Sequence, residues 1–226
     1  MSCRCSRAKA GFVVAAAFAV VLAVYVRLVR PWHRRWGATD GEVVRPLPGD
    51  ELIPEPKHDV THALLINASP GEVWPWIAQM GQGRGGLYSY DGLENLAGCD
   101  IHSVDCMLPE LQDLQPGDVV SLRRGDNPSF LVDSLEPARF LLLRSRDPKT
   151  NRPLSADDPK TGGWAATWVF FLEEAEGGST RLIVRYRAKG AHYGLEAVHF
   201  VMERKMLLGI RARAEAGALE AEAAAP

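Results

Sequence analysis

The sequence lacks an excess of basic charge. Its 226 residues carry 26 Lys and Arg against 28 Asp and Glu, a formal net charge of -2. Proteins that bind nucleic acid through a charged surface are basic there, so this balance argues against a nucleic-acid partner. Acids are missing from one end of the chain: every charged side chain from Met1 to Trp36 is basic, and the first acid is Asp40.

Cysteine is also scarce, and common catalytic and metal motifs are missing. Four cysteines in a chain of this length do not form the framework of a disulfide-rich domain. Whether Cys99 and Cys106 pair depends on the compartment and is left open. Their C-x6-C spacing around the single His102 is unlike zinc motifs, so we predict no metal. No G-x-S-x-G nucleophile motif or internal repeat is present, and no motif predicts a cofactor or an oligomeric state.

One long hydrophobic run is present, "GFVVAAAFAVVLAVYV", which Leu28 and Val29 extend. A helix over residues 11–29 is about 28 Å long, close to the hydrocarbon thickness of a bilayer. We interpret it as a single-pass transmembrane helix after a basic tail, residues 1–10, with the following domain on the cytoplasmic side. A cleaved signal peptide and a buried core helix are the alternatives. The run ends in "VYVRLVRPWHRRW", which lacks the small residues of a cleavage site.

The rest of the chain divides into a proline-rich segment, a folded domain and a tail. Residues 30–57 are predicted to form an extended linker on or near the domain, because clustered prolines oppose both helix and central strand. These prolines include Pro46, Pro48, Pro54 and Pro56. The folded domain is expected over residues 58–215, and residues 216–226 are a low-complexity Ala/Glu tail.

The domain begins with a predicted strand and two predicted helices. The strand is "VTHALLINA", residues 60–68. In the following "SPGEVWPWIAQMG", Ser69 and Glu72 have the spacing of a helix capping box, and Pro75 predicts a kink or an irregular turn. A second short helix is expected over residues 90–97, ended by glycine.

A run of strands follows, and its alternation predicts an antiparallel sheet. The predicted strands contain "VVSL", "FLVDSL", "FLLLRS", "WAATWVFFLEE" and "TRLIVRYRAKG". With a period of two, the last two strands place on one apolar face Trp164, Ala166, Trp168, Phe170, Leu172, Leu182, Val184, Tyr186 and Ala188. The opposite face is basic, which predicts that it is solvated. Its residues are Arg181, Arg185, Arg187 and Lys189.

A long amphipathic helix is predicted over residues 195–214. Its apolar stripe has a 3.6-residue period and must pack on the apolar face of the sheet. The stripe consists of Leu195, Val198, His199, Met202, Met206 and Ile210.

The predicted element order resembles the α+β helix-grip fold of the START/polyketide cyclase-like superfamily, also called SRPBCC. Specific phrases carry the resemblance. "INASPGEVWPWIAQMG" is similar to the first strand and helix of the superfamily, and "GRGGLYSYDGLENLAGCDIHSVD" followed by "LPELQDLQPGDVV" is similar to a membrane-anchored bacterial branch. The resemblance covers about residues 58–215. It implies a curved antiparallel sheet wrapped around the long helix, with a cavity between them for an apolar or aromatic small molecule.

The favoured function is therefore a membrane-tethered domain that binds or carries a hydrophobic small molecule or lipid. The expected ligand contacts are Tyr88, Tyr90, Trp164, Trp168, Phe170, Tyr186, His199, Met202 and Met206. One alternative is a cyclase- or dehydratase-like enzyme at the same cavity, because imidazole and carboxylate groups perform acid–base catalysis. Its candidate catalytic residues are Glu94, Asp100, His102 and His199. A second alternative is a structural or regulatory membrane protein without a ligand.

The glycine-rich stretch over residues 81–106 has a separate interpretation. Gly81, Gly83 and Gly86 match G-x-G-x-x-G, but they follow a predicted helix, whereas a dinucleotide site follows a strand. We predict a helix end and a tight loop that needs positive φ angles and covers one end of the cavity.

Overall fold

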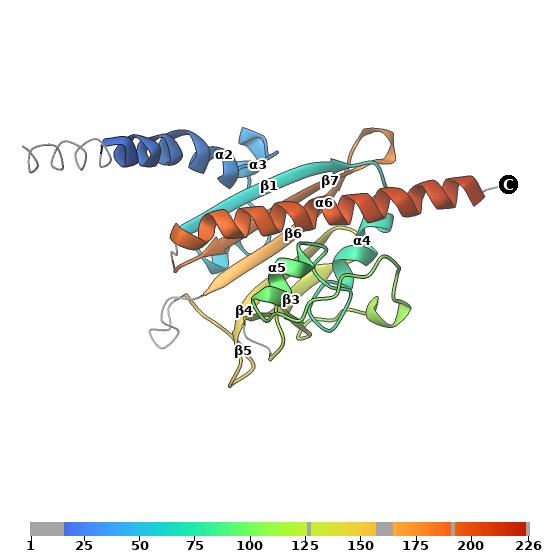
Figure 1. Cartoon of the computed structure of the whole chain (residues 1–226). Coiled ribbons are helices and arrows are strands. Elements are labelled where there is room, and N and C mark those ends of the chain that lie inside the picture. Colours follow the sequence, from blue (N-terminus) through green and yellow to red (C-terminus); the bar gives the residue numbers. More distant parts are fainter. Residues whose placement is uncertain (1–15, 126–127, 157–164, 191–192, 225–226) are drawn as a thin grey trace, which may run out of the picture.

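The computed structural model describes residues 16–125, 128–156, 165–190 and 193–224. A seven-stranded antiparallel sheet forms its centre, and a long C-terminal helix lies across one face (Figure 1). The strands are β1 (His58–Ile66), β2 (Val119–Ser121), β3 (Ser129–Glu136), β4 (Phe140–Asp147), β5 (Arg152–Pro153), β6 (Ala166–Glu174) and β7 (Thr180–Ala188). They run in the order β1-β7-β6-β4-β3-β2, with β5 paired to β4. The α+β helix-grip architecture expected from the sequence is confirmed.

Alternation along β6 and β7 sets the inner face of the sheet, as predicted. Trp168 lies opposite Tyr186, and Phe170 opposite Val184. Phe170 and Val184 are fully buried, and Trp168 is 7% exposed. Trp164, expected on the same face, lies outside the described residues.

Two helices, α4 (Pro70–Ala78) and α5 (Asp91–Leu96), connect β1 to the rest of the sheet. Ser69 and Glu72 form both halves of the expected capping box. α4 continues through Pro75 as one helix. α4 packs between the last helix and the sheet, where its buried side chains join the core.

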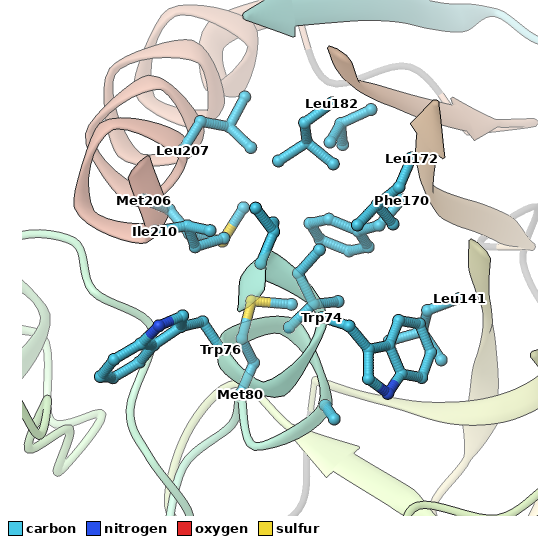
Figure 2. Packing of buried hydrophobic residues seen from close by; sticks show 14 of the residues in the cluster. Trp74, Trp76, Met80, Leu141, Phe170, Leu172, Leu182, Met206, Leu207 and Ile210 are labelled. Atoms are coloured by element: carbon cyan, nitrogen blue, oxygen red, sulfur yellow. The ribbon is translucent and has the colours of Figure 1, made fainter. Parts of the chain in front are cut away.

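The last helix, α6 (Tyr193–Ala224), buries side chains of its middle turns in the core, among them Met206, Leu207, Ile210 and Ala214. Figure 2 shows side chains of α6 pointing toward those of the sheet, with side chains of α4 beside them. The labelled residues are Trp74, Trp76, Met80, Leu141, Phe170, Leu172, Leu182, Met206, Leu207 and Ile210. Toward its N-terminal end the helix buries other residues than those of the predicted apolar stripe. Val198 is 55% exposed, whereas Glu196 and Glu203 are buried.

The outer face of the sheet is covered by residues 37–53, here called the outer segment. It contains α3 (Asp40–Val44) and the 3-10 turn η2 (Asp50–Leu52), and its Leu47 joins a second apolar cluster with Ile183 and Val169. The prediction that this face of the sheet is solvated is therefore wrong. Arg185 on this face is 4% exposed and donates to Asp50 Oδ2 at 2.6 Å. The outer segment also contains helical turns where an extended linker was expected.

An N-terminal helix, Ala16–Arg34, is long and apolar enough to cross a membrane, and only 6% of its apolar window is buried. It projects past the end of the sheet at which α6 begins (Figure 1). Its last turns are the π-helical η1 (Tyr25–Val29) and α2 (Arg30–Arg34). The rings of Trp32 and His33 lie 5.3 and 5.4 Å from the ring of Phe200 on α6. The membrane-length helix is thus attached to the domain beside the start of α6.

Candidate functional site

A cavity of about 670 Å³ lies between the inner face of the sheet and the first turns of α6. Five strands, α6 and neighbouring loops contribute to its wall. The lining residues are His58, Leu122, Pro128, Ser129, Phe130, Ser145, Arg146, Leu154, Ala166, Trp168, Tyr186, Ala188, Gly190, Glu196 and His199.

Small side chains explain why the interior is hollow here and solid elsewhere. Ala166 of β6 lies opposite Ala188 of β7, and both are on the inner face. Toward the other end of these strands, Phe170 and Leu172 fill the space against α4 and α6. Because protein interiors are otherwise close-packed, a pair of alanines at a sheet end leaves a volume that neighbouring side chains do not fill.

Aromatic rings form the apolar wall. The ring of Trp168 lies 5.7 Å from that of Phe130 and 6.5 Å from that of Tyr186. Trp168 Nε1 donates a hydrogen bond to Glu203 Oε1 at 2.7 Å, which fixes the indole. A rigid aromatic wall of this kind suits an apolar or aromatic ligand.

One end of the cavity is polar and is centred on Glu196. Arg30 of α2 donates to both carboxylate oxygens, from Nε at 2.7 Å and from Nη2 at 2.8 Å. His58 Nδ1 lies 3.2 Å from Glu196 Oε1. The hydrogen bonds from Arg30 lower the pKa of Glu196 to about 2, against the opposing effect of burial. Glu196 is therefore a carboxylate at neutral pH.

A second imidazole–carboxylate pair lies deeper, between β1 and α6. His62 Nε2 faces the carbonyl oxygen of His33 at 2.7 Å, and its Nδ1 contacts Glu203 Oε2. A carbonyl only accepts, so Nε2 carries a proton, and the pair with Glu203 shares a further one. Burial opposes the charged forms, but Glu203 outweighs it and raises the pKa of His62. His199 and His62 likewise lower the pKa of Glu203 against burial.

The far wall carries a buried guanidinium. Arg146 Nε donates to Ser129 Oγ at 2.8 Å, and its Nη1 donates to Asn151 Oδ1 at 2.8 Å. Ser145 Oγ accepts from the backbone N–H of Ala166 at 2.8 Å. This wall is therefore polar, and its polar side chains are hydrogen-bonded to other groups of the protein.

Three of the residues expected from the sequence line the cavity: Trp168, Tyr186 and His199. Phe170 and Met206 pack in the solid part of the core instead. Met202 is half-buried, and its carbonyl oxygen accepts from Ser89 Oγ at 3.0 Å.

The residues singled out in the glycine-rich stretch do not line the cavity. Tyr88 is buried against Trp76, with ring centroids 5.9 Å apart, and Tyr90 is 40% exposed. His102 forms an exposed pair with Asp100 at 3.3 Å.

Glu94 is buried in α5, and its Oε2 has no hydrogen-bond partner within the described residues. Burial raises its pKa to about 7. Its position in α5, away from the cavity lining, does not bring it to His199.

The glycines of this stretch shape a loop, as predicted. Gly81, Gly83 and Gly86 have φ angles of 129°, 70° and 84°. A Cβ atom at Gly86 would lie 2.5 Å from the Cα atom of Ser103, so only glycine fits there. Cys106 and Cys99 are free, and no group of three or more metal-ligating side chains occurs in the described part of the chain.

His58, His62, Glu196 and Glu203 were not among the site residues predicted from the sequence, although a signal for them was present. His58 and His62 are four positions apart on β1 and therefore share a face of the strand. Glu196 and Glu203 are seven positions apart, which places them on one side of a helix, with His199 between them. Acids within an apolar helical stripe mark positions that need buried partners.

No family model and no curated protein matches the chain. Solved structures are similar to it. The Aha1 dimer from Colwellia psychrerythraea has 16% identity and a TM-score of 0.41, covering 70% of this chain and 96% of that chain. Protein NE0264 from Nitrosomonas europaea has 16% identity and a TM-score of 0.45, covering 76% and 99%. CalU16 from Micromonospora echinospora has 15% identity and a TM-score of 0.34, covering 70% and 84%. At these values the fold assignment rests on the architecture of the chain itself.

Proposed function

We propose that this chain is a membrane-tethered member of the START/polyketide cyclase-like superfamily that binds a hydrophobic small molecule or lipid. The observation that carries the proposal is the cavity of about 670 Å³ between the sheet and the start of α6. Ligand pockets of this size are mostly apolar, with a few placed polar groups, and this cavity combines an aromatic wall with one polar end. A domain without a ligand would fill this space, as it does around Phe170 and Met206.

The N-terminal helix supports the membrane part of the proposal. Ala16–Arg34 has the length and composition of a membrane span, and it docks beside the end of α6 that borders the cavity. A lipid leaving the bilayer would have a short route to the cavity. We place the domain on the cytoplasmic side.

A cavity-filling variant tests the proposal. Ala166→Trp places a large ring in the cavity, and Ala212→Trp places the same ring on the exposed side of α6. With the full chain held in lipid-free amphipol, we expect a fluorescent fatty acid to bind the wild type and Ala212→Trp, and to bind Ala166→Trp about tenfold more weakly or not at all. Equal binding by all three proteins, or no binding by any, contradicts the proposal.

A further inference from the structure

The polar end of the cavity contains an imidazole in a defined protonation state. Arg30 holds Glu196 as a carboxylate, and His58 Nδ1 lies 3.2 Å from Glu196 Oε1. A carboxylate only accepts hydrogen bonds, so Nδ1 of His58 carries the proton and Nε2 carries a lone pair. Within the described part of the chain this Nε2 has no hydrogen-bond partner.

The environment keeps this imidazole neutral. Burial lowers the pKa of His58 below its ordinary value of 6.5, although Glu196 opposes the shift. Burial also lowers the pKa of His199. Both rings line the cavity, so a bound molecule would meet neutral imidazoles that can accept a proton at neutral pH.

A phenol completes the cluster. The ring of Tyr186 lies 5.6 Å from that of His58 and 4.8 Å from that of His199, and the two imidazoles are 5.7 Å apart. Burial raises the pKa of Tyr186 to about 12, so its hydroxyl keeps its proton. One wall of the cavity therefore presents proton acceptors beside a hydrogen-bond donor, and these are the groups that acid–base catalysis requires.

His62 differs from His58 in its hydrogen bonds and in its position relative to the cavity. Both of its ring nitrogens are occupied, by Glu203 and by the carbonyl of His33, and its side chain is fully buried. It has no free lone pair and does not line the cavity. The His62–Glu203 pair is therefore structural. Of the two neutral imidazoles on the cavity wall, His58 is the one oriented by a hydrogen bond to a carboxylate, because His199 Nε2 lies 3.7 Å from Glu203 Oε1.

We propose that His58 is the general base of a proton-transfer site, acting on an apolar ligand that carries a carbonyl group. The inference rests on the proposed function, because the ligand must first occupy the cavity. Nε2 removes a proton from the carbon next to the carbonyl, the C–H electron pair forms a carbon–carbon double bond, and the carbonyl oxygen takes the displaced pair and accepts a hydrogen bond from Tyr186. In a ligand with a β,γ carbon–carbon double bond, the carbonyl then re-forms, the double bond moves next to it, and the γ-carbon takes the proton from Nε2, which completes an isomerisation. No oxidant, reductant or co-reactant is consumed.

Glu196 and Arg30 are positioning residues in this site. The carboxylate of Glu196 holds the proton of His58 on Nδ1, and Arg30 holds the carboxylate. The helix of membrane-spanning length therefore contributes, through Arg30, to the orientation of the base. Partners of this kind fix the tautomer and the direction of a catalytic imidazole.

A generic proton-transfer probe, 5-nitrobenzisoxazole, tests the base without knowledge of the natural ligand. A base removes its ring C–H proton, the electron pair forms a nitrile, the N–O bond breaks and a coloured nitrophenolate is released. With the full chain in amphipol, we expect His58→Gln to lower kcat/KM about tenfold or more. The matched variant His102→Gln changes an exposed histidine outside the cavity and should leave kcat/KM unchanged.

The pH profile separates positioning from structure. The rate should fall with decreasing pH below 6.5, through the lowered pKa of His58. Glu196→Gln removes a group that raises that pKa, so the profile should move to lower pH.

Nitrogen NMR of the wild type should show His58 protonated on Nδ1 alone at neutral pH, a result that does not depend on the folding of any variant.

The outcomes are distinct for the two proposals. Equal elimination rates in wild type and His58→Gln, or an Nε2-protonated His58, would falsify the inference. If the fluorescent fatty acid still binds these proteins, the ligand-binding proposal stands while the base is lost. If it binds none of them, both proposals are lost.

Discussion

Arg30 and Glu196 are 166 positions apart in the chain, yet Arg30 donates two hydrogen bonds to the Glu196 carboxylate, at 2.7 and 2.8 Å. Arg30 lies in the last turns of the helix of membrane-spanning length, and Glu196 lines the cavity. The contact joins the candidate anchor to the candidate site. It is largely shielded from solvent, because the side chain of Arg30 is 24% exposed and that of Glu196 is 3% exposed.

Removing the guanidinium should cost stability. Arg30→Gln leaves a buried carboxylate without its main partner, and we expect the free energy of unfolding to fall by about 2 kcal/mol. Guanidinium unfolding of the full chain followed by circular dichroism measures it. Arg139→Gln breaks an exposed pair with Glu136 and should change stability by less than about 0.5 kcal/mol. A similar effect of both substitutions would contradict the role given to Arg30.

Stability should depend on the ionisation of Glu196 in acid. Its pKa is about 2 in the folded state and ordinarily 4.5. Because the folded pKa is depressed, the stabilisation is fully present above pH 4.5 and is lost as the pH falls toward 2, by at most about 3 kcal/mol. In Glu196→Gln the decline of unfolding free energy below pH 4.5 should be shallower. The exposed control Glu51→Gln should keep the wild-type slope, and the idea fails if Glu196→Gln keeps it too.

Two glycines of α6 provide a matched pair for the packing of the glycine-rich loop. A Cβ atom at Gly209 would lie 2.3 Å from the carbonyl oxygen of Tyr88, whereas nothing lies within 4 Å of the same atom at Gly217. Gly209→Ala should therefore destabilise the protein by about 1–3 kcal/mol through overpacking. Gly217→Ala should be neutral or stabilise it by up to about 1 kcal/mol through helix propensity. Thermal unfolding compares the two, and a stabilising Gly209→Ala would show that the loop does not pack on α6 at this point.

The buried arginine of the outer face should be essential to the fold of the outer segment. Arg185 contacts Asp50 and donates to the carbonyl oxygens of Glu42 and Val43. Arg185→Met leaves these groups unpaired, and we expect a loss of about 3 kcal/mol and faster proteolysis within residues 37–53. Arg123→Met alters an exposed side chain and should change neither. Unchanged protection of the outer segment in Arg185→Met would contradict this.

Regular alternation was enough to predict the inner face of β6 and β7. Trp168 and Tyr186 face the interior, as their period of two requires, because each strand contacts the core along one side. The capping box of α4 was equally local, since Ser69 and Glu72 lie within one turn. Features decided by neighbours in the chain were therefore accessible from the sequence.

The polar part of the site depends on partners that are distant in the chain. Polar residues are ordinarily assigned to solvent, and Glu196 and Glu203 are buried because histidines of β1 and Arg30 neutralise them. Arg185 was assigned to a solvated face for the same reason, and Asp50, 135 positions away, reverses that assignment. No local pattern specifies such pairs. Which residues of α6 are buried, and which segment covers the outer face of the sheet, are therefore known only from the structure.

Photocrosslinking tests the central claim, that an apolar ligand occupies the cavity, most directly. A fatty acid carrying a diazirine is bound to the full chain in amphipol and irradiated, and the modified residues are mapped by peptide mass spectrometry. We expect labels on the lining of β6, β7 and the start of α6, around Trp168, Tyr186 and His199, and loss of these labels in Ala166→Trp. Labels confined to the helix Ala16–Arg34 or to the exposed surface of α5 would contradict it.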